Sequence, residues 1–267
     1  MEQILTTGLG YGESPRWHEG RLWLANWGTQ EIVAVDLTGA SEVVARVPTT
    51  IPYSIDWLPE GRLLVVSGQE ALLLRQEPGG SLVTHADLSG LGKVFNEIVV
   101  DGRGNAYVNG ENVVLVTPDG SARPVADGLA FGNGMAVTPD NSTLIVAESH
   151  GRRLTAFDIG TDGGLSNRRV WADLGDGVPD GICIDAEGAV WYADVPNKRC
   201  VRVREGGEVL QMVQLDRGGF ACMLGGPDGR TLFILAAQWR GMENIGDPGR
   251  TGQVLLTQAP APGAGWP

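Results

Sequence analysis

Four side chains with oxygen donors occupy matching positions in a repeated sequence unit. Glu13 lies seven residues before a turn, and Asn96, Asn133 and Asp180 each lie eight residues before one. Two carboxylates and two amide oxygens would form a hard, all-oxygen site with a formal charge of −2. Such donors suit Ca²⁺, Mg²⁺ or Mn²⁺, with water or substrate completing the coordination. The spacing therefore predicts a divalent-metal centre if the four positions meet in space.

The elements that could bring these residues together follow from the repeat itself. The six turns are centred on residues 20, 61, 104, 141, 188 and 229, at intervals of 41, 43, 37, 47 and 41 residues. This period is typical of one four-stranded blade of a propeller. Each turn precedes a short apolar run, such as Leu63-Leu64-Val65-Val66, that is too short for a helix. We therefore expect an all-β chain whose residues 1–267 form a single six-bladed β-propeller.

The two ends of the chain are expected to close the ring. The first unit contains four predicted strands, at residues 14–17, 21–25, 31–36 and 42–45. The sixth unit lacks its outermost strand, because its third strand is followed only by residues 258–267, which are rich in Pro, Ala and Gly. Residues around Ile4 and Leu5 can supply that strand, which would leave no bare sheet edge. Residues 258–267 are then expected to form a C-terminal tail.

The first strand of each blade lines the central channel of a propeller, so equivalent positions on different blades converge on its axis. The four oxygen-bearing side chains should therefore meet at one point. An alternative for each is that Asn or Asp beside Gly or Pro simply forms a turn, but the shared register on four blades favours the metal centre. The other two blades present Tyr53 and Cys222 at corresponding depth, as candidate walls of a substrate pocket. No His is placed by the sequence to activate Cys222 as a nucleophile.

Composition narrows the class of protein and its partners. The chain has 42% apolar and 19% charged residues, enough for an ordered core, and its net charge is −12 with an isoelectric point of about 4.7. This acidity argues against nucleic acid or an anionic membrane as partner, but not against a cation. Three scattered cysteines without a Cys-x-x-Cys motif argue against a disulfide framework or a thiolate zinc site. Without a signal peptide or transmembrane run, a cytoplasmic monomer or weak homo-oligomer is expected.

Four segments of the chain resemble the signature segments of the SMP-30/gluconolactonase/luciferin-regenerating-enzyme family: ESPRW (13–17), FNEIVVD (95–101), GNGMA (132–136) and VPDGICID (178–185). The resemblance extends from about Leu9 to Gln258. It implies a six-bladed propeller with a divalent cation at the channel mouth and, in many members, hydrolysis of sugar lactones. It also implies that the family's metal ligands, a Glu, an Asn and an Asp, fall on Glu13, Asn133 and Asp180.

The resemblance assigns a further asparagine, Asn96, to substrate or to a metal-bound water in sugar lactonases, and to direct calcium ligation in related phosphotriesterase-type propellers. Two positions depart from the sugar lactonases. Val94 stands where they often carry an Arg, and Glu97 stands where an Asp is usual. Glu97 is a candidate for substrate binding and a second-choice acid or base, although adjacent residues on a strand face opposite ways and Glu97 is expected to point away from the channel. Several aromatic residues could make the pocket less polar: Trp17, Trp27, Phe95, Phe131 and Trp239.

The functional hypothesis is a metal-dependent lactonase. One divalent cation, Ca²⁺ by expectation with Mg²⁺, Mn²⁺ or Zn²⁺ as alternatives, would polarise the lactone carbonyl and activate a water for attack. Asp180 is the expected general base, and Asn96 would orient the substrate or the water. A second hypothesis keeps the site and changes the substrate to an ester or phosphotriester. A third is a non-enzymatic propeller in which the cation ties the blades together.

Overall fold

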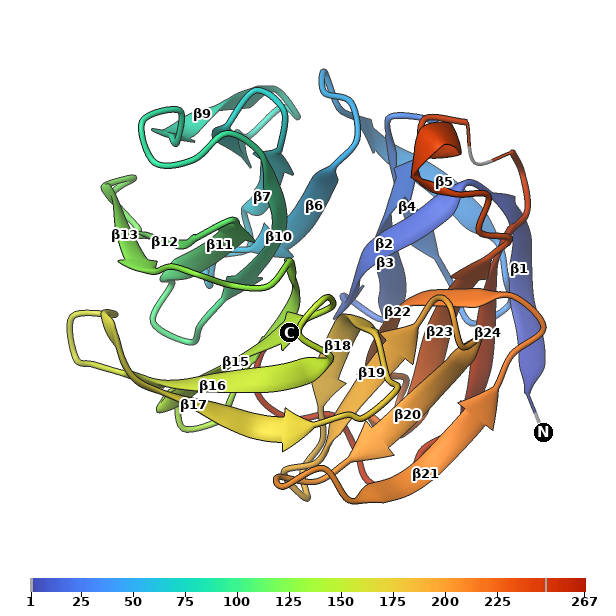
Figure 1. The fold of residues 1–267 in the computed structure, drawn as a ribbon. Coiled ribbons are helices and arrows are strands. Elements are labelled where there is room, and N and C mark those ends of the chain that lie inside the picture. Colours follow the sequence, from blue (N-terminus) through green and yellow to red (C-terminus); the bar gives the residue numbers. More distant parts are fainter. Residues whose placement is uncertain (1, 248) are drawn as a thin grey trace.

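The computed structural model describes residues 2–247 and 249–267, which form six four-stranded sheets arranged around a central axis (Figure 1). Each sheet is a blade of four antiparallel strands, and the innermost strands of neighbouring blades contact one another around the axis. Within the described residues the only helix is a short 3₁₀ turn, η1 (Met242–Asn244), so none is long and apolar enough to cross a membrane. The predicted all-β, six-bladed propeller is confirmed.

The blades share one order, with strands counted from the channel outward. The first three contain β2 (Tyr11–His18), β3 (Arg21–Trp27), β4 (Glu31–Val35) and β5 (Ser41–Arg46); β6 (Tyr53–Trp57), β7 (Leu63–Ser67), β8 (Leu72–Gln76) and β9 (Leu82–Asp87); β10 (Phe95–Val100), β11 (Ala106–Gly110), β12 (Val113–Val116) and β13 (Ala122–Ala126). The other three contain β14 (Gly132–Val137), β15 (Thr143–Glu148), β16 (Arg153–Ile159) and β17 (Leu165–Asp173); β18 (Pro179–Ile184), β19 (Val190–Asp194), β20 (Arg199–Val203) and β21 (Val209–Gln214); β22 (Gly218–Gly225), β23 (Thr231–Ala237), β24 (Gly252–Gln258) and β1 (Gln3–Leu9).

Burial explains why the second strands of the blades read as continuous apolar runs. All five residues of β7 are buried, as are all five of β19, because each strand is covered on both faces by neighbouring blades. The outermost strands, such as β5 and β21, are mostly exposed and carry polar residues. The core therefore lies between the blades, around a channel that the inner strands leave free for polar side chains.

The ring closes as predicted. Strand β1 pairs with β24 in an antiparallel register that runs from Gln3 opposite Leu256 to Leu9 opposite Gly252. The N-terminal strand thus becomes the outermost strand of the blade that contains the C-terminal strands. This pairing satisfies the backbone groups of both edges and ties the two ends of the chain together.

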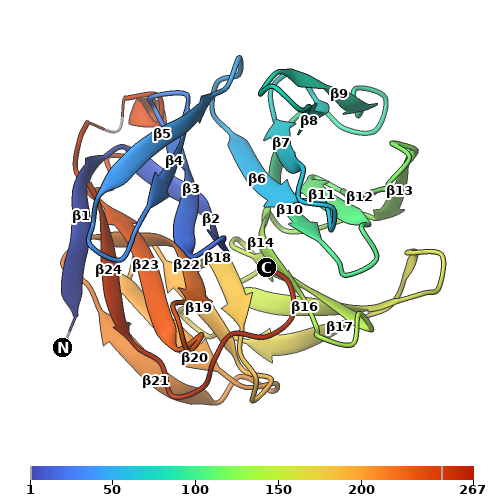
Figure 2. The ribbon, with the colours of Figure 1, turned by 180° about the vertical axis from the view of Figure 1, so that it is seen from behind.

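The segment after β24 lies against the propeller rather than away from it. Figure 2 shows it running from β24 to the centre of the ring, where the chain ends. Val137 N–H donates to the carbonyl of Trp266 at 2.6 Å, and Ala186 N–H donates to the carbonyl of Pro262 at 2.8 Å. Ala259 is 2% exposed. The C-terminal segment therefore covers the channel end at which the inner strands β14 and β18 finish.

Removing residues 259–267 should destabilise the propeller, because it strips several backbone hydrogen bonds from β14 and β18. Each such bond contributes about 1 kcal/mol net, so we expect a loss of about 2–4 kcal/mol. For a chain of this size, that loss lowers the melting temperature by about 5–10 °C. Thermal unfolding followed by circular dichroism measures the change, with deletion of Met1 and Glu2 as the control. An unchanged melting temperature would show that the segment contributes nothing to stability.

Candidate metal centre

The four residues singled out by register lie at the starts of four inner strands, on β2, β10, β14 and β18. Asn96 Nδ2 donates to Asn133 Oδ1 at 3.1 Å, which joins the third and fourth blades. Glu13 is close enough to Asp180 for the charge of Asp180 to raise the pKa of Glu13. The structure thus brings all four to one end of the channel. Glu13 is buried, whereas the other three are partly exposed and can be reached from the mouth.

A β-bulge marks the place on each strand where one of these residues sits. The inner strand shifts register against its neighbour in all four blades, between Glu13 and Arg16, Phe95 and Glu97, Gly132 and Met135, and Pro179 and Ile182. A bulge inserts an extra residue and re-aims the side chains around it. The pairing of β6 with β7 has no such shift, whereas β22 shifts against β23 between Gly219 and Ala221, and neither blade supplies any of the four residues. The bulges therefore turn the donors toward the channel.

Two glycines next to the donors allow the inner strands to converge. A Cβ atom on Gly134 would lie 2.5 Å from the backbone nitrogen of Ile182, and one on Gly181 would lie 2.5 Å from Ala221 Cβ. Both separations are too short for any side chain, and the nearby atoms belong to backbone or to a packed methyl group. The fourth, fifth and sixth blades can therefore approach closely only with glycine at these positions.

The carboxylates of the centre are electrostatically unfavourable on their own. Burial raises the pKa of Glu13 well above its ordinary value, and the charges of Asp180 and Glu97 raise it further. Burial and the charge of Glu97 likewise raise the pKa of Asp180, while a hydrogen bond from Asn133 opposes the shift. Like charges held this close favour a cation between them. Carboxylate and amide oxygens are the donors that divalent ions such as Ca²⁺ prefer, so the residues fit the predicted metal.

Strand alternation predicted that Glu97 points away from the channel, but its side chain points into the channel. Its Oε1 accepts a hydrogen bond from Ser14 Oγ at 2.8 Å and lies 3.6 Å from a guanidinium nitrogen of Arg16. The bulge in β10 breaks the alternation, so Asn96 and Glu97 both turn inward. Arg16 also lies 3.4 Å from a carboxylate oxygen of Asp56. A buried ion group of Arg16, Asp56 and Glu97 therefore fills the channel below the candidate centre.

Two further polar residues orient the centre, and the sequence analysis did not predict them. Ser149 Oγ donates to the carbonyl of Pro179 at 2.7 Å and accepts a hydrogen bond from Asn133 Nδ2 at 3.3 Å. Asn109, which is fully buried, accepts from the backbone N–H of Glu97 and donates to the carbonyl of Asn133. Both lie at the ends of second strands. A polar residue that closes an otherwise apolar strand is the signal that could have found them.

The structure places three of the suggested pocket residues elsewhere. Trp17 follows Glu13 by four residues on β2, about 13 Å further along an extended strand, and stacks on Phe233 at the opposite end of the channel. There it borders a cavity of about 530 Å³ beneath the C-terminal segment. Tyr53 is fully buried, and its hydroxyl donates to the carbonyl of Asn26 at 2.5 Å. Cys222 lies between the fifth and sixth blades, with its Sγ 4.0 Å from that of Cys183.

Other aromatic residues do reach the end of the channel that carries the centre. Phe131 is 48% exposed two residues before Asn133, and its ring stacks on that of His150. Trp239 is 38% exposed and packs against Tyr11 and Phe220, with ring centroids 5.8 and 5.9 Å apart. Trp27 and Phe95, which the sequence suggested for the mouth, are instead buried in the core. Two separate aromatic groups therefore flank the mouth.

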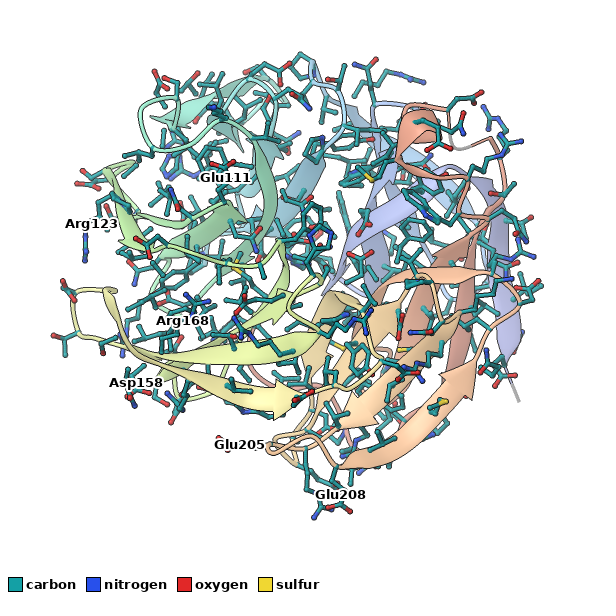
Figure 3. The ribbon with its side chains drawn as sticks, viewed as in Figure 1. Glu111, Arg123, Asp158, Arg168, Glu205 and Glu208 are labelled. Carbon is teal, nitrogen blue, oxygen red and sulfur yellow. The ribbon has the colours of Figure 1, made fainter. Side chains whose placement is uncertain are left out.

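A buried ion cluster anchors the connection that carries Phe131. Burial alone would raise the pKa of Glu148, but hydrogen bonds from Arg153, Thr155 and the backbone N–H of Ala130 outweigh it and lower the pKa to about 2. Arg168, labelled in Figure 3, adds a fourth partner at 3.1 Å. The carboxylate therefore ties the strands of this blade to the connection at the channel mouth.

Comparison with known proteins shows the family of this chain. Residues 11–238 match the family described as the SMP-30/Gluconolactonase/LRE-like region. The chain belongs to this family. Among curated members, regucalcin from Xenopus laevis is 27% identical over 89% of this chain and 86% of its own length. The 6-deoxy-6-sulfogluconolactonase of Pseudomonas putida is 29% identical over 60% of this chain and 56% of its own length.

Solved structures agree on the fold of this family. A luciferin-regenerating enzyme superposes with a TM-score of 0.84 at 18% identity, covering 99% of this chain and 98% of that one. A calcium-binding protein, regucalcin, from Agrobacterium tumefaciens superposes with a TM-score of 0.81 at 19% identity, covering 99% and 95%. Within the described residues no group of three or more His, Cys, Asp or Glu side chains is arranged to hold a metal. The candidate centre differs from such groups because two of its four donors are asparagines.

Replacing Ser149 by Ala should weaken divalent-metal binding about tenfold, because residues behind a metal ligand typically contribute 10- to 100-fold to affinity. Without the Ser149 hydroxyl, the amide of Asn133 loses the acceptor that keeps its Oδ1 facing the centre. Calorimetric titration of chelator-stripped protein with Ca²⁺ or Mn²⁺ measures the loss. Ser67→Ala, which removes a hydroxyl bonded to Glu70 instead, is the matched control. Equal affinity in both variants would contradict a positioning role for Ser149.

The Glu148 cluster should make stability sensitive to acid. Because the folded-state pKa of about 2 lies below the ordinary value of 4.5, the contribution is complete above pH 4.5 and is lost as the pH falls toward 2. This lowering of the pKa of Glu148 corresponds to about 3 kcal/mol of unfolding free energy at neutral pH. Urea unfolding at pH 7, 4 and 3 should show the gap between the parent protein and Glu148→Gln shrinking as pH falls. Glu208→Gln, at an exposed glutamate labelled in Figure 3, should show a small gap at every pH. A pH-independent gap for Glu148 would contradict the assignment.

Proposed function

We propose that this protein is a divalent-metal-dependent hydrolase that opens lactones. The observation that carries the proposal is the meeting of Glu13, Asn133 and Asp180 at the channel end, with burial and mutual repulsion that a bound cation would offset. The name of the Pseudomonas putida relative, a 6-deoxy-6-sulfogluconolactonase, supports lactone chemistry in the family. The Agrobacterium propeller of similar fold is described as calcium-binding, which supports a divalent ion.

Glu13, Asn133 and Asp180 are the residues that would hold the cation, with Asn96 as a fourth donor or as a contact to substrate or water. Ca²⁺ is the favoured ion because all the donors are hard oxygens, and Mg²⁺, Mn²⁺ and Zn²⁺ are the alternatives. A bound divalent ion supplies Lewis acidity that polarises a lactone carbonyl and lowers the pKa of a coordinated water.

The protein's own side chains divide the remaining work. Asp180 is partly exposed at the mouth and is the proposed base that accepts a proton from the attacking water. Asn96 is also partly exposed, and its amide can orient the substrate or the water beside Asn133. Glu97 is buried and already engaged by Ser14 and Arg16, so we propose a supporting role for it rather than direct proton transfer.

A related candidate is hydrolysis of another ester, including a phosphotriester, at the same centre. The exposed Val94 and Phe131 beside the centre favour it, because they offer apolar surface to a substrate without hydroxyl groups. A panel of aldonolactones, aliphatic lactones, an aryl ester and a phosphotriester separates the two candidates. If the metal raises the melting temperature and nothing is hydrolysed, the proposal gives way to a binding propeller.

Turnover should disappear when the protein is stripped with a chelator and return when a divalent ion is added back. Asp180→Ala should lower kcat by about 10²- to 10⁴-fold even with the ion present, because it removes both a metal ligand and the proposed base. Initial rates across the panel measure both effects. Asp176→Ala is the matched control. Asp176 is an exposed aspartate four residues before Asp180 that pairs with Arg199, and this variant should keep the parent's rate. Turnover by Asp180→Ala at the wild-type rate would contradict the assignment of Asp180 as metal ligand and base.

A further inference from the structure

We propose that the substrate carries an apolar substituent, an alkyl chain or aryl ring, on the side of the lactone that faces the channel mouth. This inference rests on the proposed function and names the substrate class of the same site. It comes from the layer of side chains that lies between the candidate metal centre and solvent.

An apolar or aromatic residue lies two positions before each donor. Tyr11 precedes Glu13, Val94 precedes Asn96, Phe131 precedes Asn133 and Val178 precedes Asp180. The inner strands begin at the mouth and run to the covered end of the channel. Val94, Phe131 and Val178 lie directly before β10, β14 and β18, on the connections at the mouth, whereas Tyr11 lies on β2 and is fully buried. A substrate whose carbonyl reaches the centre is therefore expected to pass Val94 and Phe131 at the mouth.

Two members of this layer are open rather than packed away, whereas Tyr11 is fully buried in the core. Val94 is 39% exposed and Phe131 is 48% exposed, and no core cluster contains either residue. Trp239, at 38% exposed, extends the apolar surface over the sixth and first blades through its contacts with Phe220 and Tyr11. Phe131 also has a φ of 61°, which an aromatic residue adopts only when its surroundings enforce it. Apolar side chains held open at the entrance to a polar centre indicate contact with an apolar ligand.

Two charged groups near the same end of the molecule are already engaged, and the exposed Lys93 and His150 lie beside Val94 and Phe131. Glu148 is occupied by Arg153 and Arg168. Arg199 is held by Asp176 and Asp194. Sugar hydroxyls that face Val94, Phe131 or Trp239 would lose hydrogen bonds to water. An alkyl or aryl substituent would instead be removed from water there, which is favourable.

The experiment is a chain-length series on the metal-loaded protein, from γ-butyrolactone through γ-octalactone to γ-dodecalactone, with δ-gluconolactone for comparison. We expect kcat/KM to rise about threefold for each added methylene until the chain leaves the layer. Phe131→Ser and Trp239→Ser should flatten this dependence, so that the kcat/KM of γ-dodecalactone falls toward that of γ-butyrolactone. Val209→Ser, at an exposed valine on the outermost strand β21, is the matched control and should leave the slope unchanged.

The outcomes separate this inference from the proposed function. Hydrolysis of δ-gluconolactone at least as efficient as that of γ-dodecalactone, with no dependence on chain length, would keep the lactonase and overturn the apolar substituent. If no lactone is hydrolysed, the proposed function fails, and calorimetric binding of alkyl-substituted and unsubstituted γ-lactams decides the inference alone. Tighter binding of the alkyl lactam that Phe131→Ser weakens would support it. Equal binding of the two lactams would overturn it.

Discussion

The close approach of the inner strands is the constraint on which the rest of the structure depends. Where β14 meets β18, and β18 meets β22, the backbones come so near that Gly134 and Gly181 leave no room for a Cβ atom. Each glycine directly follows a proposed metal ligand. The same contact that seals the propeller around its axis therefore sets how near Asn133 and Asp180 can come to each other, and bulges then turn their side chains inward.

Charge in the channel is arranged in two levels. In the lower level, Arg16 partners Asp56 and Glu97, and the group is buried. In the upper level, burial and the charges of Asp180 and Glu97 raise the pKa of Glu13, and burial and the charge of Glu97 raise the pKa of Asp180. One arginine can offset the lower carboxylates, and a cation that enters from the mouth would offset the upper pair. This difference explains why a metal centre is proposed for one end of the channel and a permanent ion group for the level beneath it.

The mouth combines this polar centre with an apolar entrance. Only Tyr11 shares a strand with its donor, whereas Val94, Phe131 and Val178 lie on the connections directly before β10, β14 and β18. The polar and apolar side chains are therefore neighbours along the chain. Around them, Ser149 and Asn109 hold the asparagine amide and the strand backbones, and Glu148 anchors the connection that carries Phe131. The orientation of the site thus depends on the second strands of the third and fourth blades as well as on the inner strands.

The sequence by itself determined the fold, the closure of the ring and the register of the four donors. These follow from a repeat period and from strand alternation, which are local properties of the chain. Only the tertiary structure decided the direction of Glu97, the burial of Tyr53 and Cys222 between blades, and the help that Ser149 gives to Asn133. A bulge overrides alternation, and contacts between blades join residues far apart in the chain, so neither can be read from the order of residues. Trp17 is an intermediate case, because the rise per residue of β2 already sets it far from Glu13.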